Sequence, residues 1–122
     1  MSNHPITHDE FSTIDRKASA KFYADVFGWQ VQDYPEMNYT TLNSGEKTEI
    51  GLNPIGEDYP AGTVAVYIQT DDVAASLARV QAAGGTILNP ETEIPTVGWF
   101  GFFKDPAGNM VGLMKWKPQT PA

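Results

Sequence analysis

Residues 11–29 read FSTIDRKASAKFYADVFGW, and residues 68–85 read IQTDDVAASLARVQAAGG. A shift of 57 positions superposes the two stretches, so the chain contains an internal repeat. The shift aligns Thr13 with Thr70, Asp15 with Asp72, Ala18 with Ala75 and Gly28 with Gly85. In each copy a strand-like stretch runs into an aspartate suited to cap a helix, and a helical pattern then ends at glycine. The repeat predicts a strand followed by a helix, twice.

Three further strand-like stretches follow each predicted helix. They are roughly residues 30–33, 38–42 and 48–53 in the first half, and roughly 86–88, 98–104 and 110–116 in the second. Turn residues join the last two strands of each half, at residues 43–46 (NSGE) and 105–108 (DPAG). The stretch from Pro54 to Gly62 holds two prolines and two glycines and is typical of a linker.

The order strand-helix-strand-strand-strand, occurring twice, predicts an α+β fold of two βαβββ modules. We expect one domain over residues 1–122, with module 1 at about residues 5–54 and module 2 at about residues 63–117. One module alone does not cover its own sheet, so the two should form one curved, cup-shaped mixed sheet, within a chain or across a dimer. The concave face is the natural place for a ligand.

The composition excludes several classes of protein. The 122 residues include 8 Lys or Arg, 15 Asp or Glu and no Cys, for a net charge of −7. Without cysteine there are no disulfides, zinc–thiolate sites, iron–sulfur clusters or thiol nucleophiles. The basic residues are scattered, which argues against nucleic acid, and no apolar run reaches the ~18–20 residues of a membrane span. The first residues form no secretory signal, so we expect a cytoplasmic protein with no membrane or nucleic-acid partner.

Several short motifs, in one order along nearly the whole chain, carry a family resemblance. They are Asp15 with residues 22–29 (FYADVFGW) in module 1, and residues 66–68 (VYI), 83–85 (AGG), 97–100 (VGWF) and 105–109 (DPAGN) in module 2. Together they resemble the vicinal oxygen chelate superfamily, which includes glyoxalase I, extradiol dioxygenases, and fosfomycin- and bleomycin-resistance proteins. Residues 27–29 and 98–100 are most similar to a branch of enzymes related to lactoylglutathione lyase. The resemblance implies the glyoxalase-like fold and specifies the activity much less.

The resemblance also implies where a metal ion would be held. Metal enzymes of this superfamily use one ligand from the first and one from the last strand of each module. The corresponding positions here are His8, Gly51, Ala65 and Gly112. Only His8 offers a donor atom, so we predict no metal cofactor. A rearranged site of His8, Glu10 and Glu49, weakly holding Mn²⁺, Fe²⁺ or Zn²⁺, is the alternative.

Without a metal ion, the predicted function is to bind a small amphipathic or aromatic molecule in the cup. Strand alternation places Tyr67 and Gln69 on the face of Ala65, and Met110 and Met114 on the face of Gly112. Soft apolar groups beside a polar handle suit a flat organic ligand, and the acidic charge suits a cationic one such as a bleomycin-like antibiotic. The candidate ligand-binding residues are His8, Glu10, Glu49, Tyr67, Gln69, Trp99, Met110 and Met114.

The alternative function is a lyase- or isomerase-type enzyme related to lactoylglutathione lyase. His8 and Glu10 stand two residues apart on the predicted first strand, so their side chains share one face. They would act as general acid and base on a carbonyl or enol, or as part of the rearranged metal site.

A third function is assembly. Exposed strand edges and the aromatic stretch at residues 97–103 predict a homodimer. We assign Phe22, Phe27 and Trp29 to the core, with no functional role.

Overall fold

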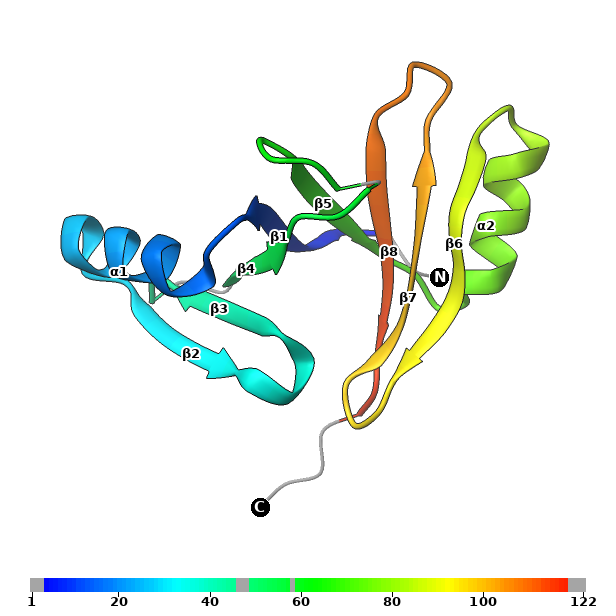
Figure 1. The fold of residues 1–122 in the computed structure, drawn as a ribbon. Helices are drawn as coiled ribbons and strands as arrows, with labels where there is room; N and C mark the ends of the chain where they lie inside the picture. The colour runs from blue at the N-terminus through cyan, green and yellow to red at the C-terminus, as the bar shows by residue number, and fades with distance from the viewer. Residues whose placement is uncertain (1–3, 46–48, 58, 119–122) are drawn as a thin grey trace. The chain divides into compact units, whose positions relative to one another are not determined.

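The computed structural model describes residues 4–45, 49–57 and 59–118. Its elements follow the order β1-α1-β2-η1-β3-β4 and then β5-α2-β6-β7-β8, which confirms the two βαβββ modules (Figure 1). The chain forms two compact units. One consists of residues 8–65, and the other of the residues up to Thr7 together with those from Val66 onward.

In the unit of residues 8–65, one helix packs on one face of a mixed sheet. The elements are β1 (Ile6–Thr13), α1 (Arg16–Phe27), β2 (Gln30–Tyr34), the 3₁₀ helix η1 (Pro35–Met37), β3 (Tyr39–Asn43) and β4 (Glu49–Pro54). The strand order is β2-β3-β4-β1, and β1 runs parallel to β4. The buried core consists of Ala20, Leu42 and Leu52, with Phe11, Tyr23, Trp29 and Ile50 packed against it.

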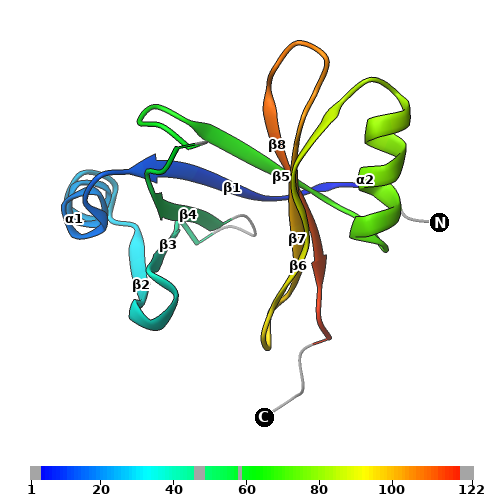
Figure 2. The same cartoon turned by 45° about the vertical axis from the view of Figure 1, so that its right-hand side comes forward.

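The second unit repeats this arrangement. Its elements are β5 (Val64–Gln69), α2 (Val73–Ala82), β6 (Thr86–Ile94), β7 (Gly98–Lys104) and β8 (Met110–Trp116), in the strand order β5-β8-β7-β6. Strand β5 runs parallel to β8, and α2 lies against β6 and β7 (Figure 2). The core consists of Val73, Leu77 and Leu113, with Ile68, Ile87, Trp99 and Phe103 packed against it.

The repeat seen in the sequence has the same local structure in both copies. Asp15 accepts a hydrogen bond from the backbone N–H of Ala18 at 3.1 Å, and Asp72 accepts one from Ala75 at 2.9 Å. Both aspartates have extended backbone angles, as expected of residues that cap a helix N-terminus. The two caps therefore explain why a helix begins at the same place in each copy.

The helix ends differ between the copies. Gly28 ends α1 in the left-handed conformation at φ 71°, as predicted. In the second copy the left-handed residue is Gly84, at φ 101°, and not Gly85, which the shift of 57 aligns with Gly28. A Cβ on Gly85 would lie 2.5 Å from Val80 Cγ1, so this glycine is needed for close packing. Within the described residues, no helix is long and apolar enough to cross a membrane.

For the three strands that follow each helix, the observed bounds lie within one residue of the prediction except at the end of β6. Strands β7 and β8 have the predicted bounds, whereas β6 extends to Ile94. The predicted start of β4 at residue 48, part of the turn at residues 43–46 and position 58 of the linker lie outside the described residues.

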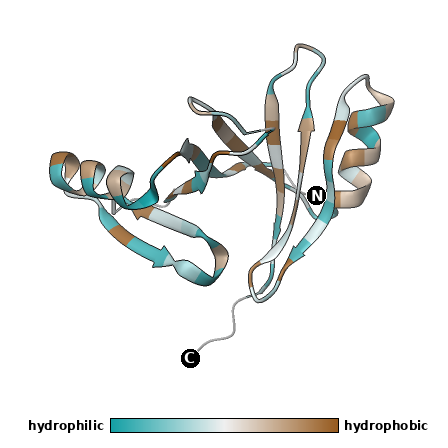
Figure 3. Ribbon diagram, viewed as in Figure 1, coloured by the Kyte–Doolittle hydropathy of each residue, from teal (hydrophilic) through white to brown (hydrophobic). Residues whose placement is uncertain are grey.

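The assignment of Phe22 and Phe27 to the core is wrong, while Trp29 does pack against it. Phe22 is 56% exposed because two residues of helix rotate the chain by about 200°, which turns it away from the buried Ala20. Phe27, 58% exposed, stands at the last residue of α1 and contacts Trp29 at a ring-centroid distance of 5.6 Å. In Figure 3, segments coloured as hydrophobic recur along α1.

Replacing either capping aspartate should destabilise the protein. We expect Asp15→Ala and Asp72→Ala each to lower the free energy of unfolding by about 1 kcal/mol, because each leaves the first helical turn without its side-chain acceptor. Chemical denaturation measures both values. Asp71→Ala removes an exposed carboxylate beside the second cap and serves as the control, and a loss equal to that of Asp72→Ala would contradict the capping role.

Candidate functional site

Strand alternation gives the sheet of residues 8–65 two faces of different chemistry. Phe11 and Leu52 pack in the core under α1, so their neighbours Glu10 and Gly51 point to the opposite side. Glu10 pairs in register with Gly51, and Gly51 with Thr41, so these three form one row across β1, β4 and β3. We call this side the Glu10 face. Its residues are His8, Glu10, Tyr39, Thr41, Asn43, Glu49, Gly51 and Asn53.

The carboxylate of Glu10 is buried, with 2% of the residue exposed, and three side chains donate to it. The hydroxyls of Tyr39 and Tyr59 donate at 2.5 and 2.8 Å, and the Asn53 amide at 3.2 Å. Burial, followed by the negative charge of Glu10, raises the pKa of Tyr59 far above its ordinary value. Tyr59 therefore stays a hydrogen-bond donor at any ordinary pH.

His8 joins this cluster through Tyr39. Its Nε2 lies 2.7 Å from the Tyr39 hydroxyl. A phenol has one proton, and that of Tyr39 goes to Glu10, so His8 Nε2 carries a hydrogen and donates it to the phenol oxygen. Burial lowers the pKa of His8 and outweighs the opposite effects of Glu10, Glu49 and Asp9, so the imidazole is neutral at neutral pH.

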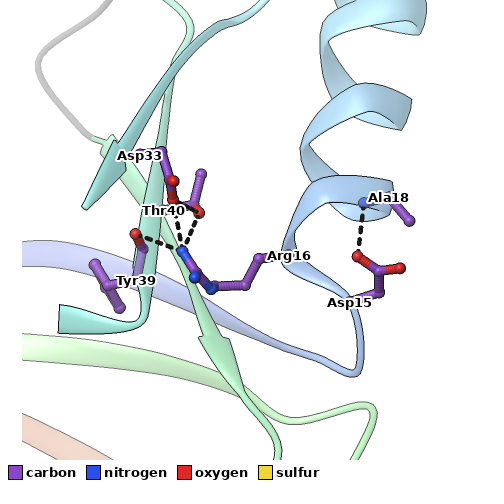
Figure 4. A network of polar contacts seen from close by, with 6 residues as sticks. All are labelled: Asp15, Arg16, Ala18, Asp33, Tyr39 and Thr40. Atoms are coloured by element: carbon purple, nitrogen blue, oxygen red, sulfur yellow. Dashed lines mark hydrogen bonds and ion pairs between the residues drawn. The ribbon is translucent and has the colours of Figure 1, made fainter. Parts of the chain in front are cut away.

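Tyr39 is held through its backbone carbonyl as well as through its hydroxyl, and Figure 4 shows the backbone contact. Asn38 ends η1 in the left-handed conformation at φ 52°, which turns the chain into β3. Arg16, the first residue of α1, donates to the carbonyl of Tyr39 at 2.9 Å, to Thr40 Oγ1 at 2.9 Å and to Asp33 at 2.6 Å. The hydrogen bond from Thr40, with those from Arg16, lowers the pKa of Asp33. The start of α1 thus fixes the strand that carries Tyr39.

Two glycines of the sequence analysis lie directly beneath tyrosine rings. A Cβ on Gly51 would lie 1.6 Å from the Tyr39 hydroxyl oxygen and 2.8 Å from His8 Nε2. A Cβ on Gly112 would lie 2.6 Å from Tyr67 Cδ2. Each tyrosine therefore occupies the space that a side chain at the glycine would need.

The residues present do not fit the metal centre that the resemblance implies. Two of its four positions are glycines covered by tyrosines, and Ala65 offers no donor. In the rearranged alternative, Glu10 already accepts three hydrogen bonds and His8 Nε2 faces Tyr39. Among residues 4–45, 49–57 and 59–118, no three His, Asp or Glu side chains are grouped so that they could hold a metal ion.

In the second unit, the sheet face opposite α2 is mostly apolar. Tyr67 pairs in register with Gly112 and Gln69 with Met114, so both lie on the side of Met110 and Met114, as predicted. Tyr67 contacts the ring of Phe102 edge-on at 5.3 Å, and Phe100 contacts Phe102 at 5.9 Å. Tyr67, Met114 and Phe102 are buried, whereas Gln69, Phe100 and Met110 are partly exposed.

Trp99 lies on the other side of the same sheet. It packs against the core under α2, and the ammonium groups of Lys115 and Lys117 lie 5.4 and 5.0 Å from the centroid of its ring. It is therefore separated from the face that carries Tyr67 and Gln69.

A cavity of about 350 Å³ lies on the α1 side of the first unit. It is lined by Phe11, Ser12, Ser19, Tyr23, Leu52, Gly62, Thr63 and Val64, which include none of the candidate site residues. Its serines already have partners, since Ser12 Oγ accepts from the N–H of Thr63 and Ser19 pairs with Thr13. The concentration of titratable groups on the Glu10 face makes that face the better candidate site.

The sequence analysis missed Tyr39, Asn53 and Tyr59. Asn53 stands two residues from Gly51 on the same predicted strand, so alternation could have identified it, whereas Tyr39 requires the register between β3 and β4. Tyr59 lies in the predicted linker, which has no regular alternation of polar and apolar residues to indicate which side chains are buried.

The chain is similar to proteins of one family over most of its length. A family model described as the Glyoxalase/Bleomycin resistance protein/Dioxygenase superfamily matches residues 6–113. CFP32 of Mycobacterium tuberculosis, which has a provisional glyoxylase name, is 34% identical over 113 residues, covering 85% of this chain. A probable lactoylglutathione lyase of Vibrio parahaemolyticus is 29% identical over 128 residues, covering 94% of this chain and 93% of that protein. The matched region is only 42% of the length of CFP32.

A solved structure supports the fold. A hypothetical protein from Bacillus halodurans superposes with a TM-score of 0.73 at 16% identity, covering 99% of this chain and 100% of the other. At that identity the likeness concerns the fold alone.

Gly51 should tolerate no side chain while Tyr39 is in place. We expect Gly51→Ala to lower the free energy of unfolding by about 1–3 kcal/mol, because the new methyl group overlaps the Tyr39 ring. In a Tyr39→Ala background the same substitution should cost much less, which a double-mutant cycle measures.

Gly56→Ala is the control for this cycle, because a Cβ there meets nothing within 4 Å. An equal cost of Gly51→Ala with and without the tyrosine ring would contradict the proposed overlap.

Acidification should destabilise the protein through His8. Its folded-state pKa lies below the ordinary value of 6.5, so the unfolded chain binds more protons as the pH falls below about 6.5. The contribution of His8 to the free energy of unfolding is therefore retained above pH 6.5 and lost as the pH falls through the folded-state pKa. Denaturation of wild type and His8→Gln between pH 8 and 5 should show a steeper loss in wild type, by up to about 1.4 kcal/mol per pH unit, and parallel profiles would refute this.

Proposed function

Because the chain belongs to the Glyoxalase/Bleomycin resistance protein/Dioxygenase superfamily, we propose that it binds a small amphipathic or aromatic molecule and has lost the superfamily's metal site. Members of this superfamily are metal-dependent enzymes or ligand-binding proteins. One observation favours a ligand-binding protein over a metal-dependent enzyme here. The glycines at two of the four ligand positions lie under Tyr39 and Tyr67, so even a substituted ligand at either position would first have to displace a ring.

The two sheet faces supply groups suited to such a ligand. On the Glu10 face, His8, Tyr39 and Asn53 are partly exposed polar side chains. On the face opposite α2, Phe100 and Met110 are partly exposed apolar side chains, with Gln69 as a polar group beside them. Buried Glu10 would act beneath the first of these faces, and Tyr67 and Met114 beneath the second, by fixing the groups that touch a ligand on that face. Trp99 and Glu49 complete the candidate set, although Trp99 contacts the core under α2.

A second candidate function is acid–base catalysis at a carbonyl or enol, as in a lyase or isomerase. It is favoured by the hydrogen-bond chain from His8 through Tyr39 to Glu10. With a hydrogen on Nε2, neutral His8 has its lone pair on Nδ1, and that atom would take a proton from a carbon acid. The imidazolium so formed would be stabilised by the Glu10 charge through Tyr39, which then orients and supports the base.

We further propose a homodimer and a cytoplasmic location. The aromatic stretch at residues 97–103 gives little support for the dimer, since Phe102 is buried and Trp99 packs inside its own unit. The exposed apolar residues Phe22, Val26 and Phe27 of α1 support it better. The cysteine-free, acidic composition supports the location.

An NMR titration with 2-phenylethanol, a neutral amphipathic probe, tests the binding function. We expect saturable shifts with a Kd on the order of millimolar, centred on the Glu10 face or on the separate face that carries residues 69, 100 and 110. His8→Ala should keep the Kd within about threefold, because a wall residue contributes little to apolar contact. Metal analysis of protein purified without chelators, and titration with Mn²⁺, Ni²⁺ and Zn²⁺, should give no stoichiometric ion.

The His8→Ala variant also separates binding from catalysis. Deuterium exchange at the carbon-bound hydrogens of dihydroxyacetone in D₂O should proceed at the buffer rate if the protein only binds. Exchange that wild type accelerates and His8→Ala abolishes would favour the enzyme. One equivalent of tightly held metal, or no saturable binding of the probe, would contradict the first proposal.

A further inference from the structure

One buried polar atom on the Glu10 face has no partner. Thr41 is 7% exposed, and within the described residues its Oγ1 has no hydrogen bond. The adjacent Thr40 is also buried, but its hydroxyl accepts from Arg16 and donates to Asp33. Buried hydroxyls are almost always paired, so an orphan on a candidate binding face indicates a group that a ligand completes.

Thr41 lies between strands β2 and β4 on this face. It pairs in register with Gly51 on β4 and with Gln32 on β2. The Tyr39 ring covers Gly51, whereas the side chains of Gln32 and Glu49 are exposed. A ligand therefore reaches Thr41 Oγ1 by displacing these surface side chains, without opening the core.

The charged side chains that the described strands place on this face are acidic. Strands β1, β3 and β4 contain no Lys or Arg, while Glu10 and Glu49 both lie on this face. The basic residues described in this unit are Arg16, Lys17 and Lys21, all on α1, which covers the other face. Two of them are already paired, Arg16 with Asp33 and Lys21 with Asp25. Ten acidic and four basic residues lie between positions 8 and 65, so the excess negative charge belongs to this unit.

We propose that the ligand of the Glu10 face carries a protonated amine, which donates to Thr41 Oγ1 and pairs with Glu49. This rests on the binding function proposed above and names the class of its ligand. An ammonium group has three donors and no acceptor, so it matches a hydroxyl oxygen beside a carboxylate. A carboxylate or phosphate in the same place would meet the negative charges of Glu49 and Glu10, and the described strands of this face carry no Lys or Arg to receive it.

Three probes with the same phenyl group and a two-carbon chain test this proposal: phenethylammonium, 2-phenylethanol and 3-phenylpropionate. NMR titrations at pH 7 should give phenethylammonium a Kd about fivefold below that of the alcohol, and about tenfold or more below that of the acid. Its amide shifts should centre on residues 39–43 and 49–53.

Two neighbouring threonines supply the matched variants. Thr41→Val should reduce the amine's advantage over the alcohol to about twofold or less, while the melting temperature stays equal or rises, because no hydrogen bond of the free protein is lost. Thr40→Val should lower the melting temperature and keep the amine preference. Glu49→Gln should reduce the ratio of amine to acid affinity by about fivefold.

The outcomes distinguish this inference from the function on which it rests. Saturable binding of all three probes with equal affinity, or a preference for the acid, overturns the amine while the binding function stands. A lower melting temperature of Thr41→Val with unchanged amine preference also overturns it, since the hydroxyl would then be structural. Failure of every probe to bind overturns the binding function and the inference together.

Discussion

The buried carboxylate of Glu10 is the constraint on which the rest of the first unit depends. An ionised carboxylate leaves water only at a cost of several kcal/mol, so it persists where donors surround it. Here the donors come from three different places in the chain: Tyr39 on β3, Asn53 on β4 and Tyr59 beyond β4. Each must stand in its place for the carboxylate to be stable, so the pairing of β1 with β4 and the position of β3 are coupled through one side chain. His8 is held in place by the same network, because its Nε2 donates to the hydroxyl of Tyr39.

The two copies of the motif share one strand pairing, in which a residue of the first strand lies opposite a glycine of the last strand. The side chains around that glycine differ between the copies. Glu10 and Tyr67 are 57 positions apart, and each pairs in register with a glycine, Gly51 or Gly112, on the parallel strand. In both units a tyrosine ring covers that glycine. The first copy surrounds its glycine with charge and hydrogen bonds, and the second surrounds it with aromatic and thioether groups. The same fold thus carries a polar face in one unit and an apolar face in the other.

Local patterns predicted most of the fold and little of the site. The caps at Asp15 and Asp72 and the alternation of β7 and β8 are signals within a few residues, and they gave helix starts and strand bounds correctly. The exposure of Phe22 depends on which side of α1 meets the sheet, which its weak pattern does not specify. The site depends on pairing between strands far apart in the chain. That Tyr39 covers Gly51, or that Trp99 lies on the side of α2, follows only once the register of neighbouring strands is known.

Parallel pairing of the first and last strand in each motif has a consequence for synthesis on the ribosome. The partner of Glu10 is Gly51 and that of Tyr67 is Gly112, so roughly 40 residues are translated between the two halves of each pair. During that interval the first strand has been made but the last strand of its motif has not, so the backbone groups that will pair with the last strand remain open to any other chain. In each motif this pairing forms only after the last strand has been made. The growing chain therefore passes through two stages in which an unpaired strand is exposed and a chaperone would protect it most.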